Sequence, residues 1–222
     1  LTQGAAGLDF ANAGTGTCTT NGTSHTYNTG DTCTVDVTFT PKYPGQRLGA
    51  VQITNMGGVV IATANIYGTG TGPLVTFPDN ATVNTINNSS FRDPTGVAVD
   101  GNGNVFVADY LGGTVKEFMA VNGVVSSSST VNIVGSGFYN PFAVAVDGAG
   151  NVFVADAGNN VVSEIVAANG VVSSSSSVSE ISNVFSSPQA IAVDGARYVF
   201  VAAYVGGTVS EIGAVNGVVS SS

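Results

Sequence analysis

The chain has 222 residues, a formal net charge of −9 and only 9% charged residues. Its five Lys and Arg residues are scattered, which excludes the clustered positive charge that nucleic acid or an anionic membrane surface requires in a partner. No apolar run approaches the roughly 18 residues of a membrane span. The 30 Gly, with many Ser, Thr and Asn, predict short strands with many turns and almost no helix.

The first region of the chain contains its only two cysteines, Cys18 and Cys33, at the ends of a polar loop rich in Thr, Gly and Asn. Two cysteines this close in a Lys-poor chain favour a disulfide and an oxidising compartment, so we expect a secreted or surface-exposed protein. A metal site is the alternative, but two thiolates do not complete the four ligands of a structural zinc. The chain starts with Leu1 rather than Met, and we therefore expect a processed or excised piece.

Four short strands are predicted in this region, at residues 8–11, 33–41, 48–54 and 59–67. Alternation is clearest in the second of them, where Val35, Val37 and Phe39 face one way and the intervening Thr and Asp residues face the other. This pattern predicts a half-buried strand.

The run Gly30–Pro41, the pair Pro44-Gly45 and the closing Gly68–Gly72 resemble the immunoglobulin-like domains of the Hydin-like group, common in bacterial surface proteins. The resemblance implies a β-sandwich domain over residues 1–72 and a bacterial source. It covers only the later strands of such a domain, so the sandwich is expected to be incomplete at its N-terminal side, with the front strands upstream or supplied by another chain. Residues 73–80 are interpreted as a linker.

Beyond residue 80 the sequence repeats. The stretch Pro94–Tyr110 returns at 141–156 and at 188–203. The Asp residues that end the apolar strand of each copy are 47 residues apart: Asp100, Asp147 and Asp194. A fixed period in this range indicates a repeat architecture.

Each repeat is predicted to hold four short strands, which in the first copy are residues 81–86, 96–100, 104–109 and 114–118. The two central strands are almost continuously apolar, as in a sheet covered on both faces. The last strand carries Glu117, Glu164 or Glu211 in the three copies, so we expect it nearer to solvent. The units are predicted at 81–128, 129–176 and 177–222, with serine-rich exposed connectors at 126–129 and 173–177.

The order of Pro, a Val-Ala-Val-Asp strand, a Gly-Asn turn and a Val-Phe-Val-Ala-Asp strand resembles the NHL-type β-propeller repeat. The resemblance covers residues 80–219 and implies an all-β fold, with three four-stranded blades after the incomplete immunoglobulin-like sandwich. In the third copy Arg197-Tyr198 replaces the Gly-Asn turn and Ala203 replaces the final Asp, so we expect that turn to be reshaped.

Three blades do not close a propeller, which generally needs about four to eight. Both ends of the repeat array look unfinished, because the last copy stops where earlier copies continue into another strand. We expect half of a six-bladed ring, completed by a longer parent chain or by a second copy.

Asp100-Gly-Asn-Gly-Asn104 is similar to the start of a calcium loop. Leu111 stands where such a loop requires Glu, and the second copy loses a further ligand. A tight turn opened by Asp is therefore the favoured interpretation.

Four residues are candidates for binding at a propeller face. Asp109 and Asp156 end equivalent strands, Tyr110 follows the first, and Tyr204 lies two periods beyond Tyr110. The two carboxylates could bind a cation or a polar ligand, and the tyrosines could form an aromatic contact surface. The alternative for the carboxylates is hydrogen bonding to backbone amides of the following turn.

Propellers of related shape include lyases and lactonases that depend on histidines as bases or zinc ligands. The single His, His25, lies in the cysteine loop outside the repeats, so the repeats hold neither a His-based acid–base pair nor a zinc site. We therefore expect no catalytic residue, no metal and no cofactor.

The expected function is that of a non-catalytic extracellular structural or interaction protein serving adhesion, filament or matrix assembly, or ligand binding. Its partners would be proteins, further copies joined through open blade edges, or glycans. The alternative is a lyase or hydrolase whose active site lies mostly in blades outside this chain.

Overall fold

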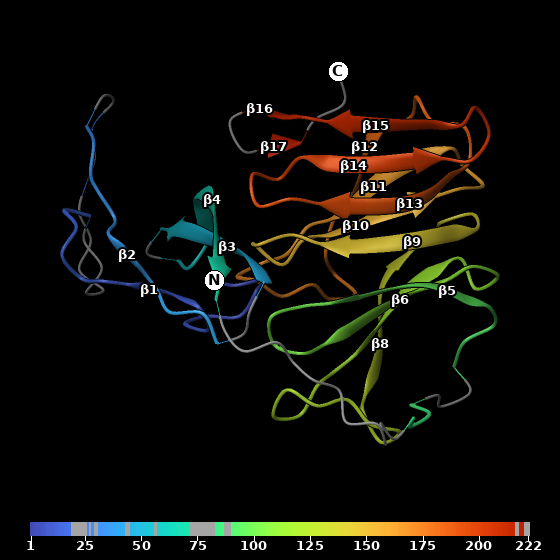
Figure 1. Ribbon diagram of the computed structural model, residues 1–222, viewed down its shortest axis with the longest axis horizontal. Coiled ribbons are helices and arrows are strands. Elements are labelled where there is room, and N and C mark those ends of the chain that lie inside the picture. Colours follow the sequence, from blue (N-terminus) through green and yellow to red (C-terminus); the bar gives the residue numbers. More distant parts are fainter. Residues whose placement is uncertain are drawn as a thin grey trace.

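The computed structural model describes residues 1–18, 26, 28, 31–42, 45–55, 57–71, 83–86, 90–215 and 218–219. All regular structure in these residues is β-strand, as the composition predicted (Figure 1). Within the described part of the chain, nothing forms a helix that could cross a lipid bilayer. His25 and the predicted linker at 73–80 lie outside the described residues.

The N-terminal region forms two antiparallel strand pairs. Strand β1 (Phe10–Asn12) pairs with β2 (Val37–Phe39), and β3 (Gly45–Thr54) pairs with β4 (Val60–Gly70). The predicted strand at 33–41 is thus confined to its second half. Residues 33–36 instead make isolated bonds to the chain before them, for example from the Cys18 amide to the Thr34 carbonyl. An immunoglobulin-like sandwich stays a prediction.

The predicted disulfide is present. Cys18 and Cys33 are bonded, and their Cα atoms lie 4.9 Å apart. The bond joins the irregular segment after β1 to the segment before β2. At the other end of this pair Phe10 stacks on Phe39, with ring centroids 4.8 Å apart. Covalent and aromatic contacts therefore hold a two-stranded pair that would be marginal by itself.

The repeats form three antiparallel sheets in which consecutive strands are neighbours. The first sheet is β5 (Pro94–Val99), β6 (Val105–Asp109), β7 (Thr114–Phe118) and β8 (Val131–Ser136). The second is β9 (Pro141–Val146), β10 (Val152–Asp156), β11 (Val161–Ile165) and β12 (Val178–Ser182). The third is β13 (Pro188–Val193), β14 (Val199–Ala203) and β15 (Thr208–Ile212), followed by a small hairpin of β16 (Ala214–Val215) and β17 (Val218–Val219).

These sheets are offset by one strand from the predicted units. Strand β8, predicted to begin the second unit, instead pairs with β7 and completes the first sheet, through registers such as Glu117↔Asn132. Strand β12 pairs with β11 and completes the second sheet in the same way. The sheets therefore span residues 94–136, 141–182 and 188–212, and the serine-rich segments connect the third and fourth strands within a sheet rather than one unit to the next. The described residues 83–86, predicted as part of a strand, are not in one.

Neighbouring sheets pack face to face through two apolar clusters. The clusters repeat with the 47-residue period: Phe106, Val115, Val152 and Val154 in the first correspond to Phe153, Val162, Val199 and Val201 in the second. The first strands of the three sheets, β5, β9 and β13, lie side by side. The central strands are apolar on both faces because the sheets pack against one another. The small Ala residues between the Val residues let the sheets approach closely.

The N-terminal region packs against one end of the three sheets, at the turns that follow β5, β9 and β13 (Figure 1). The Gly101 amide donates to the Gln3 carbonyl oxygen at 2.8 Å, and Gly4 donates to Gly148. A side chain at Gly101, Gly148 or Gly195 would collide with Thr2, Gly49 or Tyr67 respectively. The glycine after each repeat Asp thus allows a close backbone approach.

The Phe153→Ala substitution should lower the free energy of unfolding by about 3–5 kcal/mol, because it leaves a cavity where a fully buried ring joins the second and third sheets. Phe200→Ala removes the same ring one period later, where it is only half-buried, and should cost clearly less. Urea denaturation of both variants makes the comparison. Equal losses would contradict the assigned sheet packing.

Candidate functional site

The Asp100 segment is a structural turn. One carboxylate oxygen of Asp100 accepts the amides of Asn102 and Asn104 at 2.9 and 2.8 Å, and the other accepts the Asn104 side-chain amide. The Asn104 side-chain oxygen in turn accepts the Ala120 amide. The second copy repeats all of these bonds on Asp147 and Asn151. The favoured interpretation, a turn opened by Asp, fits this geometry.

The expectation that the third turn is reshaped is wrong. Its Asp194 carboxylate accepts the amides of Ala196 and Tyr198, as in the other copies. The backbone closes with the same bonds, and Arg197 adopts a φ of 72°, close to the 91° of Gly150 at the equivalent position. A residue other than Gly is uncommon in this left-handed region. The side chain rather than the backbone therefore distinguishes this copy.

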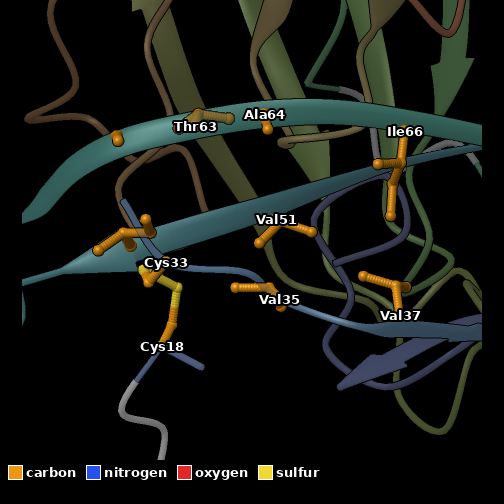
Figure 2. Close-up of a pocket in the computed structure, with 10 residues that line it drawn as sticks. Cys18, Cys33, Val35, Val37, Val51, Thr63, Ala64 and Ile66 are labelled. Carbon is orange, nitrogen blue, oxygen red and sulfur yellow. A yellow bond between two sulfur atoms is a disulfide. The ribbon is translucent and has the colours of Figure 1, made fainter. Parts of the chain in front are cut away.

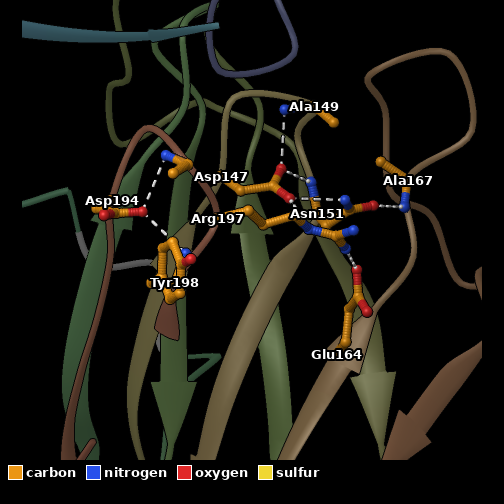
Figure 3. Close-up of polar contacts among 9 residues, drawn as sticks. Asp147, Ala149, Asn151, Glu164, Ala167, Asp194, Arg197 and Tyr198 are labelled. Carbon is orange, nitrogen blue, oxygen red and sulfur yellow. Dashed lines mark hydrogen bonds and ion pairs between the residues drawn. The ribbon is translucent and has the colours of Figure 1, made fainter. Parts of the chain in front are cut away.

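Arg197 reaches from the third sheet into a buried acidic pair of the second (Figure 3). Its Nε lies 2.8 Å from Asp147 Oδ2, and its Nη2 contacts Glu164 Oε1. The guanidinium also lies 5.6 Å from the centre of the Phe153 ring. Burial raises the pKa of Asp147 and of Glu164, while the positive charge of Arg197 opposes the rise in both. The ion pairs therefore lie inside an apolar interface between sheets.

Among the described residues, no cation forms an ion pair with Asp100 or Glu117, the corresponding acids between the first and second sheets. Glu117 is buried, although we expected its strand to lie near solvent, and the position equivalent to Arg197 is Gly150. Burial raises the pKa of Glu117 to about 7, and the neighbouring Asp100 carboxylate contributes, against a hydrogen bond from Asn132. Glu164 is buried as well, and only Glu211 is exposed as expected. The following sheet covers the faces of β7 and β11 that carry Glu117 and Glu164, whereas no sheet among the described residues covers the corresponding face of β15.

Asp109 and Asp156 do not offer free carboxylates at a propeller face. Asp109 is fully buried, accepts the amides of Arg92 and Asp93 and pairs with Lys116 Nζ at 2.6 Å. Desolvation raises its pKa, but these bonds together hold the pKa below its ordinary value. Asp156 accepts the Tyr139 amide and the Asn159 side chain. Both bind segments that precede their sheet's first strand, not only the following turn that we named as the alternative.

The two predicted tyrosines differ in accessibility. Tyr110 is half-buried with its ring edge-on to Phe142 at 6.1 Å, whereas Tyr204 is exposed. Three further side chains that the repeat pattern did not single out are exposed at the same end of the sheets: Leu111, Tyr139 and Val205. Tyr139 lies outside the repeated strands, and no periodic signal marks it. The strand pairings place all of these loops at the end opposite the N-terminal region.

A separate apolar cavity of about 340 Å³ lies in the N-terminal region between β2 and the β3–β4 pair (Figure 2). Its walls include Val35, Val37, Val51 and Ile66, and the Cys18–Cys33 disulfide lines it as well. None of its ten lining residues carries a titratable group, so these residues can supply apolar contacts but no acid–base chemistry. Among the described residues, no group of three His, Cys, Asp or Glu side chains is placed to bind a metal ion.

Arg197→Gly should lower the free energy of unfolding by about 3–5 kcal/mol at neutral pH, because it leaves Asp147 and Glu164 buried without their cation. Gly suits the left-handed backbone, so the loss reports the charge. The loss should shrink at acid pH, where both carboxyls bind protons, and in the Glu164→Gln background. Denaturation curves that match the parent protein at neutral pH would refute the assignment.

Glu117 should make the protein less stable as pH rises. Its native pKa of about 7 exceeds the ordinary 4.5, so its contribution is complete below about pH 4.5 and is lost as pH rises through 7. Between pH 4.5 and pH 8 the free energy of unfolding of Glu117→Gln should therefore rise relative to that of the parent by on the order of 1–2 kcal/mol. Glu211→Gln, the exposed equivalent, is the control and should leave the pH dependence unchanged. An unchanged slope in Glu117→Gln counts against the buried acid.

Comparison with known proteins gives one family-model match and several similar solved structures. Residues 91–118 match the family model of the NHL repeat. Similar solved structures include a catalytically inactive H270A virginiamycin B lyase from Staphylococcus aureus with quinupristin (12% identity, TM-score 0.39, covering 55% of this chain and 41% of that one). A second is a nidogen/laminin complex (12% identity, TM-score 0.38, covering 54% of this chain and 47% of that one). A third is selenomethionine-substituted virginiamycin B lyase from Staphylococcus aureus (13% identity, TM-score 0.39, covering 82% of this chain and 61% of that one).

The chain spans less than two thirds of each of these structures. No curated protein matches it. The matched segment 91–118 contains β5, β6 and β7 of the first sheet, and the same strand order recurs in the other two. The chain thus carries an NHL repeat in an all-β fold whose antiparallel sheets are of the kind that form β-propeller blades.

Proposed function

We propose that this chain is a non-catalytic extracellular interaction protein that binds protein partners through the loops at one end of its propeller-type sheets. The observation that carries the proposal is the contrast between the two ends. At one end, Gly101, Gly148 and Gly195 are in contact with the N-terminal region. At the other, Tyr139 is 62% exposed and Tyr204 is 74% exposed.

The loop end has the composition of a protein-binding surface. Leu111, Val184 and Val205 are exposed there beside the two tyrosines, in loops that also hold Asn and Gly. Tyr supplies a large contact area at a low cost in conformational entropy, and aromatic residues are enriched in interfaces. The Tyr139 amide donates to Asp156 and the Tyr204 amide donates to the Ser187 carbonyl oxygen, and such bonds lower the ordering cost of binding a partner.

The carboxylates of this end support binding rather than catalysis. Asp109 and Asp156 are buried and bonded to backbone amides, Lys116 or Asn159, and Asp156 thereby stabilises the loop that carries Tyr139. The disulfide between Cys18 and Cys33 supports an extracellular setting. A lyase or hydrolase with its active site in further blades remains the alternative and would be recognised by turnover rather than by stable binding.

Tyr139→Ser and Tyr204→Ser should each weaken partner binding by roughly tenfold or more, as expected for aromatic contacts at the centre of an interface. The measurement is surface plasmon resonance against immobilised purified extracellular proteins, with affinity compared between the variants and the parent chain. Tyr198→Ser is the matched control, since this exposed tyrosine lies in the turn after β13 at the opposite end. Loss of binding in the control but not in the two loop variants would overturn the proposal.

A further inference from the structure

The two internal sheet interfaces are copies of one another. In each, a Phe from one sheet packs in the same cluster as Val residues of the next: Phe106 with Val144 and Val146, then Phe153 with Ile191 and Val193 one period later. A sheet therefore has two different faces, one that packs on the preceding sheet and one that packs on the following sheet.

The outer faces of the array carry the same side chains without a partner among the described residues. Val97, the equivalent of Val144 one period earlier, is 67% exposed on the first sheet, and Val99 beside it is also exposed. On the third sheet, Val209 is 77% exposed, whereas its equivalent Val162 is fully buried in the second interface. The first sheet thus exposes the face that packs on a preceding sheet, and the third sheet exposes the face that packs on a following sheet.

The strand edges of the array also lack partners among the described residues. Strands β8 and β12 each precede the first strand of their own repeat and pair with the last strand of the sheet before. Strand β15 has no such fourth strand among the described residues. Residues Val83–Ile86 precede β5 as β8 precedes β9, have a similar sequence to Val131–Val134, and are in no described strand, with Val83 exposed.

Both observations demand the same placement of a partner. If a first sheet packed on a third sheet as the second sheet packs on the first, the segment ahead of β5 would run along β15. Apolar burial and main-chain hydrogen bonds would then form together, as they do between the sheets of one chain. The faces and the edge are therefore parts of one surface that fits another sheet array of this repeat.

We propose that two copies of this chain join reciprocally, the first sheet of each packing on the third sheet of the other, with Val83–Ile86 of each adding a fourth strand to β15 of its partner. The resulting array has six sheets, within the range of about four to eight at which propellers close. Reciprocal contacts between identical chains give the closed twofold symmetry that is commonest in homo-oligomers. The surface is separate from the tyrosine loops, so this inference does not rest on the proposed function.

Sedimentation velocity and light scattering of the 222-residue chain test the assembly at physiological salt, which screens the net charge of −9. The expected mass is twice 22.1 kDa. Val97→Asp and Val209→Asp should each weaken association at least tenfold, and mixing the two variants should restore a dimer through the one pair of unmodified faces. Ile61→Asp, at an exposed position of β4, is the control and should leave the dimer intact.

Strand addition is tested by cross-linking between copies. The sequence match of Val83-Asn84 to Val131-Asn132, taken with the register Glu117↔Asn132, places Asn84 opposite Glu211 of the partner. Mixed Asn84→Cys and Glu211→Cys chains should form a disulfide-linked dimer under mild oxidation, whereas Asn84→Cys with Ser210→Cys, on the other face of β15, should not. The parent chain contributes no free thiol among its described residues. A monomer at every concentration, a dimer indifferent to both Val substitutions, or equal cross-linking of both cysteine pairs would overturn the proposal.

Discussion

Burial of one sheet's Phe-bearing face against the Val-rich face of the next holds the repeat array together. Phe106 and Phe153 occupy the same place in successive interfaces, and each is almost wholly removed from solvent. Small antiparallel sheets have little stability by themselves, so each needs a neighbour to cover it. The strand ends, turns and loops take their positions from this stacking. The outermost faces at Val97 and Val209 follow from it too, because they are interfaces of the same kind without a neighbour among the described residues.

The acidic residues of the repeats serve this packing. Asp100 and Asp147 close turns, and Asp109 and Asp156 fix the segments ahead of the first and second sheets. The two interfaces nevertheless differ electrostatically. Arg197 forms ion pairs with Asp147 and Glu164 between the second and third sheets, whereas burial and the Asp100 carboxylate raise the pKa of Glu117 between the first and second. One interface thus contains buried ion pairs, and the other contains a buried acid whose charge state changes near neutral pH.

The molecule presents two kinds of surface that do not overlap. The loop end exposes Tyr139 and Tyr204, which we propose bind a protein partner, and the outer sheet faces expose Val97 and Val209, which we propose pack on a second copy. The N-terminal region occupies the remaining end through the glycines that follow each repeat Asp. The two proposed surfaces share no residue, so under these proposals partner binding and assembly would not compete.

The sequence by itself determined the all-β class, the 47-residue period, the disulfide and the turn at Asp100, because strand alternation, cysteine spacing and turn chemistry are local. Only the tertiary structure decided that strand 131–136 closes the sheet before it, that Glu117 and Glu164 are buried, and that Asp109 and Asp156 bond internally. It also decided that Arg197 preserves its turn and reaches a neighbouring sheet. Each of these depends on which distant strands lie side by side. A period of 47 residues allows strand 131–136 to join the sheet before it or the sheet after it, and only the packing of the sheets decides between them.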